Sequence, residues 1–566
     1  MKSKSLDHYK TFLVLAILIA FFIRFYSIDI PDLYYDEGGV VIGTRLFLNE
    51  GLSPWNYNTG QPPPLLYWLT SVSFIIWGIS EFSLRIVDVI FGTLTIVLLY
   101  FIVKLWYDKK VAILAAFLLA VLPLHVTYSR LGVNSDIIQT FFLLFAIFIM
   151  EYCCINRLNR SKDIFAVVLS GIAFGLSFLA KFNALILWGI YWIFIFLSSF
   201  KRRLKVSIKK FIISNLAAFT VIITATGLNL SNIFYLVYGF AYLIVAQSTL
   251  AAYPLYYRLL LLVDALSPLV FLVLIISLIY IIAEVYKKRN RSDILILSLV
   301  LGYFILTILQ PRTAARHFII ITPLMVTLVS KFIIDIYIKF NRGSKFLGKI
   351  IILTLIAFSM LWSIYEINKD IDYNVWDDVK GYINKNIPEH ATVYALYPYW
   401  PLAHRAGNST FYTFRLQRNV VMEPSIQSVK RGDVFVIGNF NASFGLTRQG
   451  PFSGALEVFG KEIYRREIRP YPKSEEFIKK NADLIKTFYC DKEACIEVYQ
   501  ITNVNYSKIK EFGNDEKWSF FASEKSKNDL FLFSCSLIEK QPFSGIITKF
   551  NTNLVMNIER KCKNFR

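Results

Sequence analysis

Cysteine, histidine and charged residues are all scarce in this sequence. Six cysteines in 566 residues are too few for a disulfide-stapled scaffold. Nothing has the ligand spacing of a zinc site. Charged residues make up only 18% of the chain, against 55% apolar and 16% aromatic residues, which excludes an intrinsically disordered protein. No heptad pattern, short-period repeat or low-complexity segment occurs, so coiled coils and solenoids are excluded as well.

The net charge is strongly positive, with 61 Lys and Arg against 40 Asp and Glu, or +21. Such a balance invites a nucleic-acid partner, but the mean hydropathy of +0.49 argues against one. A chain this apolar cannot bury its hydrophobic residues inside one or two soluble cores. The composition therefore predicts a membrane protein whose partners include membrane lipids and no nucleic acid.

Long apolar runs recur through the first two thirds of the chain, as transmembrane helices require. They predict an α-helical polytopic membrane protein with about eleven transmembrane helices. We expect these spans near residues 11–28, 84–105, 111–126, 137–152, 164–180, 183–200, 211–230, 263–286, 293–309, 318–338 and 347–366.

The apolar segment Pro64–Gly78 is only about four turns long, which is short for a span. If it does not cross and the N-terminus is cytoplasmic, the inner loops hold 24 basic and seven acidic residues. The outer loops then hold eight basic and ten acidic residues. If it crossed, every later loop would invert and the positive-inside rule would fail. We therefore expect a multi-pass protein of the cell membrane with a cytoplasmic N-terminus, in which 64–78 lies along the outer leaflet.

The character of the chain changes after Glu366. Residues 1–366, with an outer loop at 29–83, form the predicted transmembrane domain, and 367–566 form a polar extracytoplasmic domain. A helical pattern over Val375–Asn386 and short β-rich runs indicate a soluble α/β domain. The expected strands are Thr392–Tyr397, Asp433–Ile437 and Cys495–Ile501.

Two adjacent carboxylates, Asp36 and Glu37, follow the first span in the sequence YYDEGG. Acids beside the hydrocarbon boundary are costly unless they bind something. One interpretation is that Asp36 is a general base and Glu37 its catalytic partner or a metal ligand. The other is an acid pair at the start of a helix, where Asp and Glu are favoured. Both remain open at this point.

Cations occur on several separate outer turns. Any one of them is commonly an interfacial anchor. Several together around acidic loops suit a phosphate anion at the membrane surface. The candidates for binding this phosphate are Arg85, Arg130, Lys181, Arg312 and Arg316.

Two further residues on these turns, Asp136 and His317, are candidates for orienting an acceptor. Asp136 or Glu37 is also the candidate ligand of a divalent cation. Only a carboxylate-bound Mg²⁺ or Mn²⁺ is consistent with the sequence, and the need for any cofactor stays open.

The order of these features resembles the GT-C class of polyprenyl-phosphate-sugar glycosyltransferases. The likeness is to the group of protein O-mannosyltransferases, lipid A aminoarabinose transferases and RgtA/B/C/D-like enzymes, and it covers about residues 11–340. The matching motifs are Asp36-Glu37, then Pro63-Pro64-Leu65, then Gly78, Ser80, Glu81 and Arg85, then Pro123, Ser129, Arg130 and Asp136, then Leu179-Ala180-Lys181, and last Arg316-His317 with Pro323.

The resemblance implies transfer of a sugar from a polyprenyl phosphate, dolichyl or undecaprenyl, to a glycan, lipid or protein acceptor outside the cytoplasm. It implies a single inverting displacement in which Asp36 deprotonates the acceptor hydroxyl. Among the cations, Arg130, Lys181 and Arg316 match family motifs. The alternatives are a transporter or flippase of lipid-linked sugars, which predicts charged residues near mid-membrane, and a non-catalytic receptor.

Overall fold

We analysed a computed structural model of the chain. It describes residues 2–30, 35–51, 54, 63–132, 135–156, 159–199, 201–229, 232–233, 236, 259, 262–263, 265–309, 315–339, 344–372, 375–388, 391, 393–395, 404–406, 410–412, 419–421, 434–438, 482–490 and 493–502.

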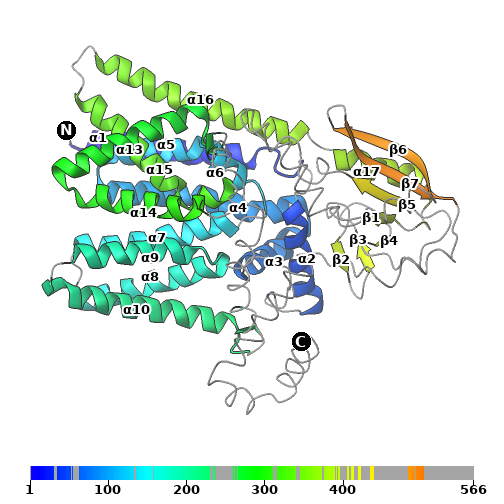
Figure 1. The fold of residues 1–566 in the computed structure, drawn as a ribbon, viewed down its shortest axis with the longest axis horizontal. Helices are drawn as coiled ribbons and strands as arrows, with labels where there is room; N and C mark the ends of the chain where they lie inside the picture. The colour runs from blue at the N-terminus through cyan, green and yellow to red at the C-terminus, as the bar shows by residue number, and fades with distance from the viewer. Residues whose placement is uncertain are drawn as a thin grey trace.

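Most of the described chain is a bundle of roughly parallel and antiparallel helices (Figure 1). Within the described ranges, nine helices are long and apolar enough to cross a membrane, and the chain is a multi-pass membrane protein. Each of the eleven predicted spans overlaps a helix, so the predicted fold class is confirmed. The helices are α1 (Lys2–Phe25), α2 (Tyr35–Glu50), α3 (Leu65–Trp77), α4 (Glu81–Trp106), α5 (Lys109–Val121), α6 (Pro123–Tyr128), α7 (Ser135–Asn156), α8 (Arg160–Ala180), α9 (Ala184–Ser198), α10 (Lys201–Ala225), α13 (Pro268–Lys288), α14 (Arg291–Ile308), the 3₁₀ helix η2 (Ala315–Ile321), α15 (Thr322–Lys339) and α16 (Ser344–Asp372).

Several helices differ in their bounds from the predicted spans, and two of the differences have a clear cause. The span expected at 111–126 is broken between α5 and α6, because Pro123 has no N–H to continue the ladder. The helix expected from 211 begins at Lys201, because Lys and Arg are good helix formers although they are not apolar. Hydropathy therefore located the apolar core of each helix more accurately than its ends.

Polar caps fix several helix starts. Ser80 precedes α4 and forms a capping box with Ser83: the Ser80 hydroxyl accepts from the Ser83 N–H at 3.1 Å, and the Ser83 hydroxyl accepts from the Ser80 N–H at 2.9 Å. Asp108 caps α5 by accepting from the N–H groups of Lys110 and Val111. These caps end the preceding turns and set where each span enters the bundle.

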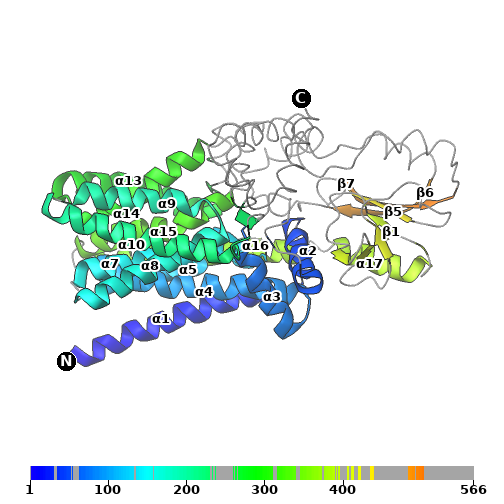
Figure 2. The ribbon, with the colours of Figure 1, turned by 90° about the horizontal axis from the view of Figure 1, so that it is seen from below.

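Helices α2 and α3 lie at one end of the bundle rather than along it, and α2 runs across that end (Figures 1 and 2). We call this the α2 end; α1 ends there and α4 begins there. Helix α3 has 13 residues, too few to cross a 30 Å hydrocarbon layer at 1.5 Å per residue. Its place agrees with the expectation that 64–78 does not span.

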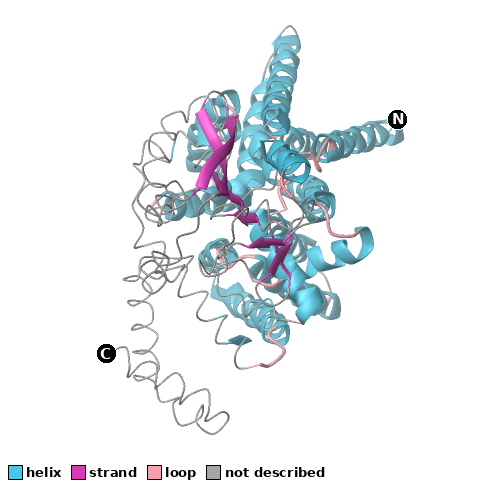
Figure 3. Ribbon diagram, turned by 90° about the vertical axis from the view of Figure 1, so that its right-hand side faces the viewer, coloured by secondary structure: helices cyan, strands magenta, loops and turns pink. Residues whose placement is uncertain are grey.

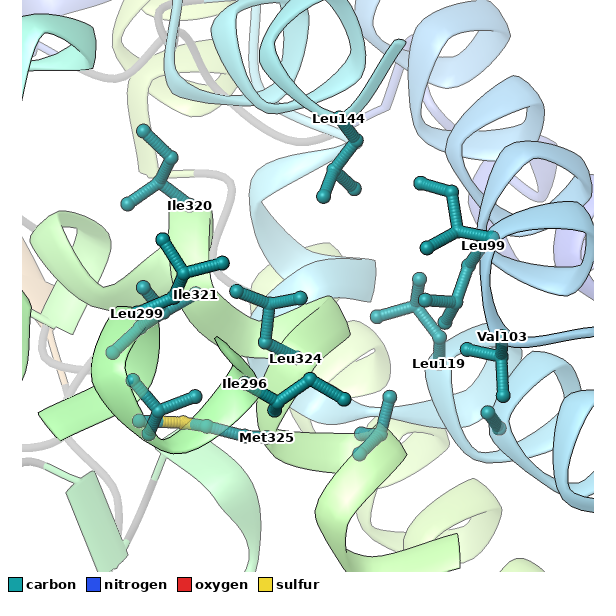
Figure 4. Packing of buried hydrophobic residues seen from close by; sticks show 14 of the residues in the cluster. Leu99, Val103, Leu119, Leu144, Ile296, Leu299, Ile320, Ile321, Leu324 and Met325 are labelled. Carbon is teal, nitrogen blue, oxygen red and sulfur yellow. The ribbon is translucent and has the colours of Figure 1, made fainter. Parts of the chain in front are cut away.

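The bundle core is a continuous apolar cluster contributed by many helices. Figure 4 shows part of it, where side chains of α4, α5 and α7 face those of α14, η2 and α15. Its labelled members are Leu99, Val103, Leu119, Leu144, Ile296, Leu299, Ile320, Ile321, Leu324 and Met325, all of them buried. Close packing of these side chains holds the span ends, and therefore the polar turns between them, in fixed positions.

After α16 the chain forms α17 (Val375–Asn386) and a seven-stranded mixed sheet (Figure 3). The strands are β1 (Val393–Ala395), β2 (His404–Ala406), β3 (Thr410–Tyr412), β4 (Asn419–Val421), β5 (Val434–Gly438), β6 (Ala482–Cys490) and β7 (Glu493–Ile501), in the order β2-β3-β4-β1-β5-β7-β6. Among the described strands, the parallel pairs are β1 with β4 and β1 with β5, in which Val393 lies opposite Val420 and Val434.

The expected helix and the three expected strands all lie on observed elements of this sheet region. Helix α17 packs on β6 through Tyr382 and Phe488, whose rings lie 5.9 Å apart. Helix α16 runs past the expected domain boundary at 366 and ends at Asp372. The polar domain is therefore joined to the bundle by a continuous helix.

Candidate functional site

Glu37 lies on α2 and points into the bundle, where Arg85 of α4 meets it. Arg85 donates from Nε and Nη2 to the two carboxylate oxygens of Glu37, each at 2.8 Å, and from Nη1 to the Ile28 carbonyl at 2.6 Å. The exposed fractions of the two side chains are 1% and 0%. This is a fully desolvated bidentate ion pair, which ties α2 to the end of α1 and the start of α4.

The turn before α7 joins the same pair through Gly132, whose N–H donates to Glu37 Oε1 at 2.9 Å. A Cβ at position 132 would lie 2.4 Å from Leu84 Cγ and 2.9 Å from the Leu84 carbonyl oxygen. Only glycine allows the turn to come this close to α4. Both oxygens of Glu37 are thus used in holding three elements together.

A second ion pair joins the start of α7 to the end of α8. Lys181 Nζ lies 2.8 and 2.6 Å from the two oxygens of Asp136. Asp136 is buried, with 1% of its side chain exposed, whereas Lys181 keeps 23% exposed. The lysine therefore remains accessible to a further anion at the α2 end.

Polar side chains from three helices support this second pair. Gln139 of α7 donates to the Lys181 carbonyl at 2.5 Å and to Asn183 Oδ1 at 2.6 Å. Asn183 in turn donates to the hydroxyl of Tyr303 on α14 at 2.9 Å. This network fixes the backbone turn that presents Lys181.

Helix η2 brings Arg316 and His317 to the same place. It packs against α7, α14 and α15, and Lys181 and Arg316 are both close enough to His317 to act on it electrostatically. Both η2 residues are partly exposed. Lys181, Arg316 and His317, which are far apart in the sequence, are therefore neighbours in the fold.

Arg130 has a different environment from Lys181. Its Nη1 donates to the carbonyls of Ile23, Arg24 and Tyr26 at 3.0, 2.9 and 2.6 Å. These are carbonyls of the last turn of α1 and the residue after it, which lack partners within the helix. This guanidinium closes the end of α1.

Arg24 is fully buried and makes up for the helix break at Pro123. It donates to the carbonyls of Leu119 and Ala120 at 3.2 and 2.8 Å and contacts His125 Nδ1 at 2.9 Å. The Leu119 carbonyl is the one that Pro123 cannot reach with an N–H. The sequence analysis did not select Arg24 as a candidate, although an arginine inside an apolar run is itself a signal.

The side chains of two predicted site residues, Asp36 and Arg312, lie outside the described residues. Asp36 is on α2, one residue before Glu37, and its side chain lies outside the described residues. Arg312 lies outside them entirely. The structure therefore brings the α2 backbone that carries Asp36 to the end where Lys181 and Arg316 lie.

Arg45 of α2 is a cation that sequence analysis did not select. It is partly buried, burial lowers the pKa of its guanidinium from the usual value, and its Nε has no hydrogen-bond partner in the described part of the chain. The available signal was its place on the same outer loop as the two carboxylates. It is a further candidate for contact with an anion.

The two carboxylates named as metal ligands do not fit that role in this arrangement. Both oxygens of Glu37 accept hydrogen bonds from Arg85, and both of Asp136 accept from Lys181. Over the described ranges, no three His, Cys, Asp or Glu side chains gather as a metal would require. A cation beside each carboxylate already supplies the positive charge that Mg²⁺ or Mn²⁺ would bring.

Parts of the chain are similar in sequence to known proteins. Residues 61–228 match the family described as dolichyl-phosphate-mannose-protein mannosyltransferase. A putative mannosyltransferase of Bacillus subtilis, YycA, is 29% identical over 240 residues, which is 41% of this chain and 32% of that protein. An uncharacterized protein of Aquifex aeolicus is 40% identical over 86 residues, or 14% of this chain and 20% of that one. The chain thus spans about a third or less of the length of the curated relatives it matches.

Solved structures match over more of the chain. ArnT from Cupriavidus metallidurans, bound to undecaprenyl phosphate, has a TM-score of 0.60 at 13% identity over 86% of this chain and 97% of that one. The Archaeoglobus fulgidus oligosaccharyltransferase, tethered to an acceptor peptide, has a TM-score of 0.52 at 17% identity over 69% and 62%. The chain has the fold of the GT-C glycosyltransferases, and the resemblance drawn from the motifs is confirmed.

Proposed function

We propose that this chain is an integral-membrane glycosyltransferase. It moves a sugar from a polyprenyl-phosphate-linked donor to an acceptor hydroxyl of a glycan, lipid or protein on the extracytoplasmic face. The α2 end is the proposed active site. The likeness to ArnT, which was solved with undecaprenyl phosphate, supports a donor of this class.

One observation carries the proposal: Lys181, partly exposed, lies beside Arg316 and His317 at the end crossed by α2. A lipid phosphate at the membrane surface needs cations that remain accessible, and Lys181 and Arg316 provide them. Arg85 and Arg130 are engaged with Glu37 and with the α1 carbonyls. We therefore assign the phosphate to Lys181 and Arg316, with Arg45 as an additional contact, and leave Arg85 and Arg130 a positioning role.

The proposed reaction is one inverting displacement. The Asp36 carboxylate takes the proton of the acceptor hydroxyl, and the acceptor oxygen attacks the anomeric carbon. The bond from that carbon to the phosphate oxygen breaks, and the polyprenyl phosphate leaves with the electron pair. Lys181 and Arg316 stabilise the charge that grows on the phosphate oxygens. Asp136 orients Lys181 through both of its oxygens, and Glu37 holds α2 in place.

The test is transfer from a radiolabelled polyprenyl-phosphate sugar by the purified full chain and by its Asp36→Asn variant. A missing general base is expected to lower kcat by on the order of 10² to 10⁴. Asp29→Asn is the matched control, because Asp29 is an exposed acid seven residues earlier on the same loop. It should retain the activity of the unmodified chain.

Full turnover by the Asp36 variant would exclude this residue as the base while leaving the transferase in place. Another result would refute the transferase activity itself. It is the absence of transfer to every acceptor class, together with movement of lipid-linked sugar across the membrane of liposomes that contain no acceptor. That outcome would establish the flippase alternative. The two failures are thus distinguishable in one set of reconstituted samples.

A further inference from the structure

Helices α8 and α10 begin side by side at the end of the bundle opposite to α2. They run parallel, because Asp163 meets Lys210 near their starts and Gly171 meets Ser214 further along. A Cβ at Gly171 would lie 2.1 Å from the Ser214 carbonyl oxygen, so the two helices touch closely along their length. Their first turns therefore form one surface.

This surface is strongly cationic. Among the described side chains, residues 160–163 of α8 and 204–210 of α10 hold five basic residues and one acid. The acid, Asp163, lies 2.6 Å from Lys210 and is neutralised by it. The two parallel helix N-termini add partial positive charges of the same sign. Four cations here are exposed and have no carboxylate partner in the described part of the chain: Arg160, Lys162, Lys205 and Lys209.

The cations lie at the start of a segment that is apolar enough to cross a membrane. The segment Leu204–Ala225 is apolar enough to cross a membrane, and only 11% of it is buried in the bundle. Leu204, Val206 and Ile208, with exposed fractions of 36%, 55% and 42%, alternate with the lysines. The apolar side chains therefore face acyl chains, while the long lysine side chains from the same turns reach the headgroups.

Some other basic residues at this end pair with acids. Arg291 forms a bidentate pair with Glu151, and Lys331 lies against both oxygens of Asp335. Lys288 pairs with Glu284 on the same helix. A general excess of positive charge sets topology, but it does not require four exposed cations to lie together on two adjoining helix starts.

We propose that the first turns of α8 and α10 form a binding site for anionic phospholipids, which are recognised by their phosphodiester headgroups in the leaflet opposite to the α2 end. Charge complementarity and the apolar residues between the lysines both require a lipid, with headgroup and acyl chains contacted together. Because α10 packs mainly on α8, a bound lipid also holds α10 on the bundle. This site is independent of sugar transfer.

The test is a titration of the purified full chain with dioleoylphosphatidylglycerol and with dioleoylphosphatidylcholine, read by native mass spectrometry. The variant carries Lys162→Gln, Lys205→Gln and Lys209→Gln. Each cation near an anionic surface contributes roughly a factor of five to affinity, so the variant should bind phosphatidylglycerol on the order of 100-fold more weakly. Binding of phosphatidylcholine should be unchanged.

The control removes the same charge from the same end of the bundle, by Lys110→Gln, Lys287→Gln and Lys349→Gln. These lysines are exposed too but lie outside the α8–α10 surface. The control should bind phosphatidylglycerol like the unmodified chain. Equal losses in the two triple variants would overturn the site and leave only a general charge effect.

Two measurements on the unmodified chain need no variant. Its preference for phosphatidylglycerol over phosphatidylcholine should fall when salt rises from 0.15 to 0.5 M. The Debye length is about 8 Å at 0.15 M and becomes shorter at higher salt, so the attraction between the lysines and the headgroups weakens. Free glycerol phosphate at the same concentration should not displace the lipid. Absence of any preference, or displacement by the soluble phosphate, would refute the assignment to a lipid.

Discussion

The buried pair of Glu37 and Arg85 gives the sharpest test of how the site is built. Arg85→Met keeps the length of the side chain but removes its charge, which leaves the Glu37 carboxylate with no exposed surface and without its cation. It also removes three donors that now reach their acceptors at 2.6–2.8 Å. Breaking one half of a buried pair costs about 3–5 kcal/mol, so we expect a loss of that size.

The double variant Glu37→Met with Arg85→Met should be more stable than Arg85→Met alone, because it leaves no uncompensated buried charge. It does not restore full stability, because the Gly132 N–H then lacks its acceptor. The assay is reversible unfolding of the purified chain in mixed micelles, with each variant compared to the unmodified protein. Transfer kinetics are measured on the same samples.

The opposite pattern would refute this reasoning. If Arg85→Met unfolds like the unmodified chain while its KM for the lipid-linked donor rises tenfold or more, Arg85 binds the phosphate and the pairing with Glu37 is incidental. If the double variant loses as much stability, relative to the unmodified chain, as the two single variants lose together, then the two residues do not act as a pair.

Further predictions follow from the other contacts. Gly132→Ala should destabilise the chain by about 1–3 kcal/mol in the same unfolding assay, because its Cβ meets the backbone of Leu84. Arg130→Met should cost about 2–4 kcal/mol, since the α1 carbonyls lose a charged donor, and should leave the KM for the donor unchanged. Lys181→Met should raise that KM at least tenfold yet destabilise less than Arg85→Met, because Lys181 is partly exposed. Transfer should persist in EDTA to within about twofold, since a cation already neutralises each described carboxylate of the site.

Much of the fold follows from hydropathy, because a span must be apolar whatever it packs against. That argument predicted eleven apolar segments, each of which overlaps a helix, and nine helices of the described residues are long and apolar enough to cross a membrane. It could not place the start of α10 at Lys201, since a basic helix outside the hydrocarbon has no hydropathic signature. Nor did it reveal the break at Pro123, because the apolar run continues through the extended Leu122 although the helical hydrogen bonding does not.

The site was predictable in its residue types but not in its pairings. Sequence placed acids and cations on the same outer turns, and the fold pairs Lys181 with Asp136, which the sequence did not predict. It could not show that Arg85 faces Glu37, 48 residues away, or that Arg130 faces backbone carbonyls. A cation that binds a ligand and one that closes a helix look alike in a sequence, because both place the same charge on the same turn.

Arg24 has a consequence for how the chain enters the membrane. Its acceptors, the carbonyls of Leu119 and Ala120, are made 95 and 96 residues later. At about 5–20 residues per second of synthesis, α1 exists for roughly 5–20 s before these acceptors are available. Until then Arg24, in the last turn of α1, can reach only water, headgroups and carbonyls of its own helix such as that of Ala20. The packing of the first helix is therefore completed only when the third span arrives, so the break at Pro123 bears on the order of assembly as well as on the shape of α5.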